Sequence, residues 1–481
     1  MLCGFFLWLG LHGVPVAGFT PDDAIYLLMA EYFSNPTFDD GVLIYVQSVT
    51  HFPPLYPLFI AGLTQYANLH EQAFLVHSLC AVAACLTWAL VISRHIEMRW
   101  RFTLIILSLA LLPGTLLLTT ALWSEFLYLL LIALAILCFE RAEHHPSYIW
   151  FCAVAVGLAA ATRGFGLVAA IALFMVLLRR SPRTSFAVLL ITTLPVAFGH
   201  LLGYGGGSYV EIFLQRVDSF AAFESALRQN LAALGNGWLS LFAPHSPRLA
   251  LAINCVFLPL ALYGFTRRLF AWKFDAVYLG GYLALLLIWP FPHVIGRLAY
   301  GALPIVALHA VIGASHLTER FPGPGKCCTA LLVVSVALGN GYSLYELSAR
   351  YYSPDLPQSL HSWRASQAWL SATSPPAGIA DLQIKQATIE ILQQLDQTLP
   401  AKACVYSDFP QPVMLRARRA SWPAPVGSDR PDTPECGFHL IVSDSTVRKS
   451  VDALWPDYEI LKQQQTDSGP GALLVRYNNY R

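Results

Sequence analysis

The chain of 481 residues is 56% hydrophobic and only 12% charged, with a formal net charge of +1. Soluble proteins carry roughly 25% charged residues, so this composition excludes an ordinary soluble protein and indicates a polytopic membrane protein. The balanced charge also argues against a nucleic-acid partner. Residues 1–17 form an apolar run without a basic leader or a small-residue cleavage site, so we interpret them as a retained first helix rather than a signal peptide.

Apolar runs free of Asp, Glu, Lys and Arg recur along the first 345 residues, and we interpret each as a membrane span. Two of them are short for a hydrocarbon core of about 30 Å, which favours tilted or kinked helices. The sequence thus predicts a polytopic α-helical domain of about 11 transmembrane helices over residues 1–345. The spans are expected at 2–17, 73–93, 102–120, 126–139, 148–161, 165–178, 184–203, 249–266, 276–290, 298–315 and 327–345.

The basic residues of the short loops indicate the orientation in the membrane. The long loop at 18–72 contains no Lys or Arg, whereas the alternate loops are rich in Arg and also contain Lys273 and Lys326. By the positive-inside rule the basic loops are cytoplasmic, and so is the N-terminus. An odd number of spans then places the C-terminus outside, as in a multi-pass protein of the bacterial inner (cytoplasmic) membrane. The basic loops contain Arg94, Arg99, Arg101, Arg141, Arg179, Arg180, Arg183, Arg267, Arg268, Lys273, Arg320 and Lys326.

Two long outer loops are too apolar to be simple linkers, and each contains a predicted helix. In the first, a helix is expected from Pro21 to about Phe33, because Thr20 is a good N-cap and proline is favoured at the first helical position. Asp22 and Asp23 would then face the positive end of the helix dipole, which is by itself a sufficient structural role for both. In the second loop, the amphipathic stretch at 209–234 predicts an interfacial helix.

Residues 346–481 are richer in Pro, Gln, Asp and Arg, and they predict a soluble extracytoplasmic α/β domain in the periplasm. Cys404 and Cys436 are the two cysteines of this domain. In an oxidising compartment they either form a disulfide or remain buried free thiols. Helices are expected at about 380–397 and 446–455, and strands at 403–408, 438–444, 458–464 and 472–477.

The predicted spans contain no Asp, Glu, Lys or Arg, which argues against an ion-coupled transporter or a proton relay. The acidic residues of the outer side instead lie just above the bilayer. A site at that interface would suit a substrate that is half lipid and half water-soluble. These residues are Asp22, Asp23, Glu31, Asp39, Asp40, Glu71, Glu125, Glu211, Asp218 and Glu224.

Five segments stand in order on the predicted outer face and cover most of residues 18–315. They are PDDAIY at 21–26, HFPPLYPLFIAGL at 51–63, LWSEFLYLLLIALA at 122–135, ATRGFGLVAA at 161–170 and IGRLAYGALPIVAL at 295–308. Each motif is weak alone, but the series resembles the GT-C class of integral-membrane glycosyltransferases. The similarity is to the bacterial aminoarabinose transferases that modify lipid A and to the protein O-mannosyltransferases.

The resemblance implies an inverting hexosyl- or pentosyltransferase that moves a sugar from a polyprenyl-phosphate carrier to a lipid, glycan or protein acceptor. Asp22 matches the catalytic aspartate of the class and would act as the base, with Asp23 beside it. Arg163 and Arg297 lie within the arginine-bearing motifs, each at the predicted outer end of a span, and would stabilise the charge on the leaving phosphate. The alternative for both arginines is ordinary anchoring to lipid headgroups.

Four further residues are candidates for substrate binding under the same resemblance. Glu125 and Asp40 would orient the acceptor or the sugar, although Glu125 also suits a helix cap and Asp40 a turn. Tyr26 and Tyr56 would stack on the sugar or line the cavity, although aromatic residues at a membrane interface usually serve as anchors.

The sequence departs from the aminoarabinose branch just before the proline turn. That branch has a Glu-Lys pair there, serving a metal and the carrier phosphate, whereas this chain has His51 and Phe52. His51 suits phosphate or metal binding, or a structural hydrogen bond. No cluster has metal-ligand spacing, so we predict no metal site and no definite cofactor, and a divalent ion stays open.

Two other classes of function remain as alternatives. An envelope polysaccharide polymerase or ligase would also be polytopic with large periplasmic loops, but should have more arginine in them. A lipid-linked oligosaccharide transporter or flippase is disfavoured by the charge-free spans. The expected partners are thus a polyprenyl-phosphate-linked sugar donor, its acceptor and membrane lipids.

Overall fold

The computed structural model describes most of the helical part of the chain and the core of the C-terminal part. The predicted first span, the helix predicted at 446–455, and the candidates His51 and Asp40 lie outside the described residues. The described residues are 21–35, 52–64, 69–96, 105, 109, 113–119, 121–201, 203, 214, 216–242, 246–351, 387–388, 390–400, 403–407, 410–417, 421–422, 436, 438–442, 458–466 and 469–477.

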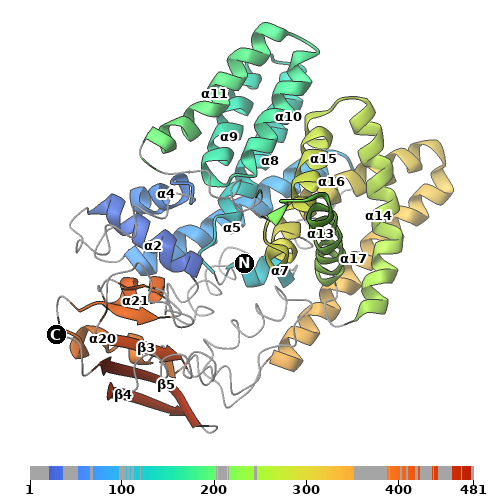
Figure 1. The fold of residues 1–481 in the computed structure, drawn as a ribbon. Coiled ribbons are helices and arrows are strands. Elements are labelled where there is room, and N and C mark those ends of the chain that lie inside the picture. Colours follow the sequence, from blue (N-terminus) through green and yellow to red (C-terminus); the bar gives the residue numbers. More distant parts are fainter. Residues whose placement is uncertain are drawn as a thin grey trace.

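The described residues between 21 and 351 lie mainly in helices, most of which pack side by side as a bundle (Figure 1). Five of them, α5, α11, α14, α16 and α17, are long and apolar enough to cross a membrane, and α9, α10 and α15 are shorter apolar helices. The helices are α2 (Pro21–Ser34), α4 (Leu55–Leu63), α5 (Leu69–Ser93), α7 (Pro113–Thr119), α8 (Glu125–Ala142), α9 (Tyr148–Thr162), α10 (Gly166–Leu178), α11 (Pro182–Leu201), α13 (Phe220–Ser240), α14 (Pro247–Phe270), α15 (Phe274–Leu287), α16 (Ile295–Arg320) and α17 (Pro322–Tyr351).

Helices therefore form at most of the predicted spans, and the total of about eleven spans stays a prediction. The helix predicted from Pro21 to about Phe33 is observed at Pro21–Ser34. In the second long loop, α13 covers the later part of the predicted amphipathic stretch, and the Ser219 side chain caps its start by accepting a hydrogen bond from the Ala222 amide. Ahead of this cap, the described residues Leu214 and Arg216 are also helical.

Helices α14 and α16 approach each other closely at two glycines. A Cβ on Gly264 would lie 2.0 Å from the carbonyl oxygen of His309, and a Cβ on Gly313 would lie 2.1 Å from that of Leu260. Any side chain at either position would force the two backbones apart. Small residues of this kind let membrane helices pack backbone to backbone.

The C-terminal part contains a five-stranded sheet in the order β2-β1-β3-β5-β4. Strand β1 is parallel to β2 and β3, and β5 is antiparallel to β3 and β4. Strands thus form where the sequence predicts them, and the short β2 was not predicted. The strands are β1 (Val405–Ser407), β2 (Ser421–Trp422), β3 (Phe438–Val442), β4 (Tyr458–Thr466) and β5 (Gly469–Tyr477).

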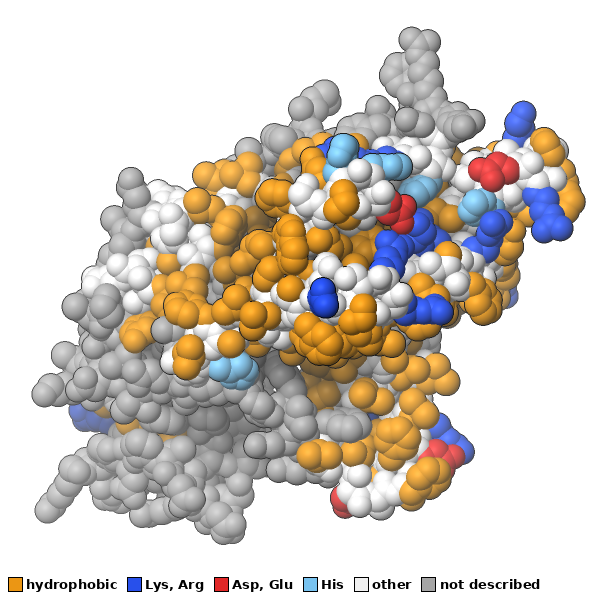
Figure 2. Space-filling model, turned by 90° about the horizontal axis from the view of Figure 1, so that it is seen from above, with side chains coloured by type: hydrophobic (Ala, Val, Ile, Leu, Met, Phe, Trp, Pro, Cys, Tyr) orange, Lys and Arg blue, Asp and Glu red, His pale blue; other side chains and the backbone are white. Residues whose placement is uncertain are grey.

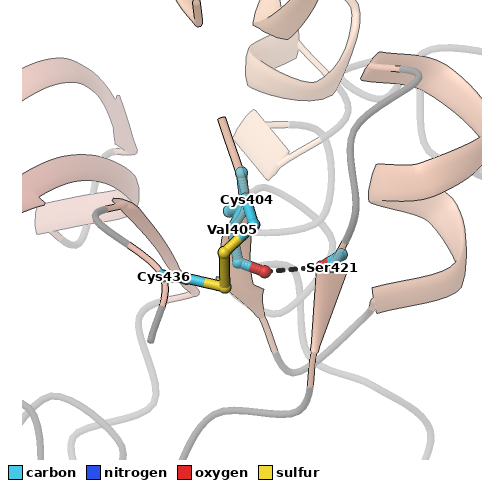
Figure 3. Close-up of a disulfide and its surroundings, with 4 residues drawn as sticks. All are labelled: Cys404, Val405, Ser421 and Cys436. Carbon is cyan, nitrogen blue, oxygen red and sulfur yellow. Dashed lines mark hydrogen bonds between the residues drawn. A yellow bond between two sulfur atoms is a disulfide. The ribbon is translucent and has the colours of Figure 1, made fainter. Parts of the chain in front are cut away.

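A disulfide between Cys404 and Cys436 ties the start of β1 to the residues before β3, which decides between the two alternatives for these cysteines. Next to it, the Ser421 hydroxyl donates to the Val405 carbonyl oxygen at 2.8 Å (Figure 3). The edge strand β2 is thereby fixed to β1 by a side-chain bond in addition to the ladder.

Helix α21 (Pro410–Ala417), which the sequence did not predict, connects the sheet to the helical bundle. It contacts α2, and its Met414 and Leu415 are buried in the same hydrophobic cluster as the apolar residues of α2. Figure 1 shows α21 and the sheet beside α2, at one end of the bundle. We call this end the domain side and the opposite end, where α10 turns into α11, the far side.

Candidate functional site

Asp22 and Asp23 both lie in the first turn of α2, as a helix start requires, but their surroundings differ. The Asp22 side chain is 28% exposed, and its Oδ2 accepts a hydrogen bond from Nη1 of Arg297 at 2.8 Å. Asp23 is buried, with 3% of its surface exposed. Of the two carboxylates, therefore, only Asp22 is open to a substrate.

Glu125 holds the two candidate arginines side by side. Its Oε1 lies 2.6 Å from Nη1 of Arg163 and 2.9 Å from Nε of Arg297. With the ion pair between Asp22 and Arg297, these contacts form one group, which we call the charge cluster. Its members come from the start of α2, the start of α8, the turn after α9 and the first turn of α16. Two cations and two anions leave the cluster neutral overall.

The turn that carries Arg163 depends on a glycine. Arg163 ends α9 in an extended conformation, and α10 begins three residues later at Gly166. A Cβ on Gly166 would lie 2.2 Å from the backbone nitrogen of Ala160, so only glycine allows so tight a turn. Burial by itself lowers the pKa of Arg163, but the Glu125 carboxylate outweighs it and the pKa is raised. Arg163 is therefore a permanent cation in the cluster.

Arg297 is held by an aromatic face as well as by carboxylates. Its guanidinium carbon lies 4.3 Å from the centroid of a Trp123 ring, close enough for a cation–π contact. Trp123 is itself buried, and its indole Nε1 has no hydrogen-bond partner among the described residues. The indole N–H is thus an unused donor directly beside the charge cluster.

A hydrogen-bond network lies behind the cluster. The hydroxyls of Tyr26 and Ser124 are bonded at 3.0 Å, and Arg163 makes a longer bond of 3.4 Å to Ser124. Tyr56 meets Nδ1 of His77 at 2.9 Å, while Nε2 of His77 faces the carbonyl of Leu118 at 3.0 Å. Because a carbonyl only accepts, Nε2 holds the proton and Nδ1 accepts from the Tyr56 hydroxyl.

The placement of the two tyrosines favours structural roles over sugar stacking. Tyr56 is fully buried and Tyr26 nearly so, and their rings meet edge to face at 4.9 Å between centroids. Burial raises the pKa of both hydroxyls, which therefore stay protonated. Phe52, at one of the positions that departs from the aminoarabinose branch, packs against the Tyr26 ring.

The structure thus brings together Asp22, Glu125, Arg163 and Arg297 and adds three residues that sequence reasoning missed as site residues: Trp123, Ser124 and His77. The first two precede Glu125 in one of the quoted motifs, which is a signal that could have been used. His77 stands inside a long apolar run and gives no such signal. Among the described residues, no group of three or more His, Cys, Asp or Glu could hold a metal ion.

Taken together, the helical bundle, the domain-side sheet and their connection have the fold of the GT-C class of membrane glycosyltransferases. Apo ArnT from Cupriavidus metallidurans is similar with a TM-score of 0.56 at 12% identity, covering 98% of this chain and 95% of that one. ArnT bound to undecaprenyl phosphate gives a TM-score of 0.52 at 12% identity, covering 99% and 97%.

A more distant likeness is to the oligosaccharyltransferase of Archaeoglobus fulgidus, with a TM-score of 0.46 and 15% identity over 87% of this chain. The present chain spans 63% of the length of that protein. No protein-family profile and no curated protein sequence matches this chain.

Proposed function

We propose that this protein transfers a sugar from a polyprenyl-phosphate carrier to a lipid, glycan or protein acceptor at the outer face of the membrane. The observation that carries the proposal is the charge cluster, in which Asp22 is paired with Arg297 beside Glu125 and Arg163. The fold supports it, since the ArnT structures include one bound to undecaprenyl phosphate. The outer-face placement rests on the distribution of basic loops.

The cluster contains the groups that such a transfer needs. The acceptor oxygen attacks the anomeric carbon while Asp22 removes its proton, and the bond from that carbon to the phosphate oxygen breaks. The electron pair leaves with the lipid phosphate, whose charge Arg163 and Arg297 stabilise. Attack on the face opposite the phosphate inverts the configuration of the sugar.

The assignment of the base to Asp22 follows from what each carboxylate already does. Glu125 is 5% exposed and holds two guanidinium groups, so it is not available to an acceptor. Asp23 is buried, as described above. Asp22 is more exposed, and among the described residues its ion pair is with Arg297. When the carrier phosphate binds Arg297, that guanidinium turns from Asp22 to the phosphate, and Asp22 becomes free to accept a proton.

Trp123 would serve the same complex by donating its indole N–H to the phosphate or to a sugar hydroxyl. A buried donor without a partner costs free energy that a bound ligand recovers. Its ring also contacts the Arg297 guanidinium.

The deciding experiment uses proteoliposomes that contain the full chain and a polyprenyl phosphate carrying a labelled sugar. Lipid, glycan and peptide acceptors are supplied separately. We expect Asp22→Asn to slow transfer by about 10²- to 10⁴-fold, the usual contribution of a general base. Asp218→Asn, at an exposed aspartate before α13, is the matched control and should keep the parental rate.

Two results would overturn the proposal at different points. Equal turnover by the parent and Asp22→Asn would show that Asp22 is not the base. Labelled carrier that stays intact with each class of acceptor, but crosses the bilayer, would identify a flippase instead of a transferase.

A further inference from the structure

A second group of charged side chains lies on the far side of the bundle, away from the charge cluster. It surrounds a cavity of about 290 Å³, which we call the far-side pocket. Figure 2, which views the molecule from this side, shows basic and histidine side chains gathered among hydrophobic ones. The charged residues that line the pocket are Arg94, Arg141, Arg268, Lys273, Glu140 and Glu143.

The walls of the far-side pocket are fixed by the ends of several helices. Arg94 follows α5, Glu140 lies in the last turn of α8, and Lys273 stands between α14 and α15. Arg268 is held from behind by Asp275, with two hydrogen bonds of 2.6 Å each. The pocket is therefore built into the framework of the bundle and does not depend on a loose surface loop.

The lining carries more positive than negative charge. Four cations and two carboxylates line the pocket. Outside the lining, Asp275 pairs with Arg268 and Arg180 pairs with Glu143, and these two further charges are opposite in sign and cancel. Lys273 is paired with Glu143 at 2.5 Å, but the contact of Arg94 with Glu140 is long, at 3.6 Å.

Arg141 is the least engaged of the four cations. Among the described residues the structure records no ion pair for it, and its guanidinium lies 5.6 Å from the centroid of the Tyr148 ring. With Arg94, it can direct hydrogen-bond donors at an anion. Arginine suits phosphate particularly well, because its planar group donates two parallel bonds.

The surroundings favour the phosphate of a lipid over a free ion. Next to Lys273, the side chains of Phe270 and Trp272 are 86% and 36% exposed. On α5, just before Arg94, Leu90 is 41% exposed. Exposed apolar side chains beside a basic pocket at the end of apolar helices are expected where acyl chains and headgroups meet the protein.

We propose that the far-side pocket binds the phosphate of an anionic membrane lipid in the leaflet opposite the charge cluster. A volume of about 290 Å³ holds roughly ten water molecules, enough for one headgroup. The proposal is independent of glycosyl transfer, since it uses none of the charge-cluster residues.

The test is native mass spectrometry of the full chain released from vesicles that contain equal amounts of phosphatidylglycerol and phosphatidylcholine. We expect the parent to retain phosphatidylglycerol preferentially. The double variant Arg94→Gln/Arg141→Gln should retain about 30-fold less, because each of the two cations near an anionic headgroup contributes about 1 kcal/mol. Arg228→Gln/Arg248→Gln removes two exposed arginines elsewhere and should behave as the parent.

A second arm separates a lipid from a free anion. The parent is heated in detergent with phosphatidylglycerol or with inorganic phosphate, and we expect only the lipid to raise the unfolding temperature. Equal retention of the two lipids by the parent would overturn the proposal without any variant. Protection by inorganic phosphate equal to that by phosphatidylglycerol would overturn the assignment to a lipid.

Discussion

Asp22 and Asp23 have the same chemistry and adjacent positions, but the helix gives them different tasks. Successive residues of an α-helix point about 100° apart, so one carboxylate faces the charge cluster while the next turns into the protein. Both still lie in the first turn, where the helix dipole favours negative charge. The capping role and the proposed catalytic role are thus compatible on one short segment.

Glu125 is the residue on which the charge cluster depends. In Glu125→Gln, the buried guanidinium groups of Arg163 and Arg297 would face each other without the shared carboxylate. We expect a loss of about 3–5 kcal/mol in the free energy of unfolding, the usual result of breaking a buried ion pair. Chemical denaturation in detergent micelles provides the measurement.

The matched control is Glu224→Gln, which breaks the exposed pair with Arg228 on α13. Such a pair contributes only about 0.2–0.5 kcal/mol on a helix surface. Similar losses for Glu125→Gln and Glu224→Gln would mean that the charge cluster is not held together by Glu125.

At the scale of single elements, packing of α14 against α16 relies on the absence of side chains at Gly264 and Gly313. In Gly313→Ala the new methyl group would meet the Leu260 carbonyl, and the helices would have to separate. We expect a destabilisation of about 1–3 kcal/mol, as for other overpacked positions. Thermal unfolding in detergent measures it.

Gly341→Ala is the control for this substitution, because a Cβ at that helical position on α17 meets nothing within 4 Å. There, alanine should be neutral or slightly stabilising, since it is the better helix former. A fall in unfolding temperature for Gly341→Ala equal to that for Gly313→Ala would rule out the close helix crossing as the cause.

Local signals explain why many elements could be predicted from sequence. The start of α2 depends on its capping residues, and the apolar runs reveal the helices that follow. The sequence pattern of residues 438–444, 458–464 and 472–477 likewise predicted strands β3, β4 and β5. Helix α21 escaped prediction because it is short, contains two prolines and gains its stability from burial against α2. Contacts across the chain leave no trace in local patterns.

The site was predictable only in part for the same reason. Arg297 and Asp22 are 275 positions apart, and no periodicity could have paired them. Both residues were predicted as site residues only because the order of motifs in the sequence resembles that of a known class. The burial of Tyr26 and Tyr56, by contrast, depends on the packing of α2 against α4, which the resemblance did not describe.

At the scale of the whole molecule, the two ends of the bundle carry different charged groups. The domain side has a neutral cluster built from two ion-paired arginines, and the far side has a pocket with excess positive charge. The C-terminal sheet lies on the first of these ends only, through α21. The disulfide, which joins residues 32 positions apart, stabilises that sheet.

Removal of the disulfide tests how the C-terminal part supports the rest. In Cys404→Ser/Cys436→Ser the unfolded segment gains freedom, and a loop of this length predicts a loss of about 3–4 kcal/mol. We expect faster hydrogen exchange in β1 and β3, followed by α21 and α2, with α14 and α16 unaffected. Cys255→Ser, at an exposed free cysteine, should leave exchange unchanged. Unchanged exchange in α2 of the double variant would show that α21 holds its place without the disulfide.

The contact of α21 with α2 also has a consequence for the order in which the protein matures. Synthesis proceeds from the N-terminus, so α2 is made long before residues 410–417 emerge from the ribosome. Until then the apolar surface of α2 that Met414 and Leu415 bury in the folded protein is not covered by α21. The segment that carries Asp22 therefore reaches its final environment only after residues 410–417 have been made and have folded against it.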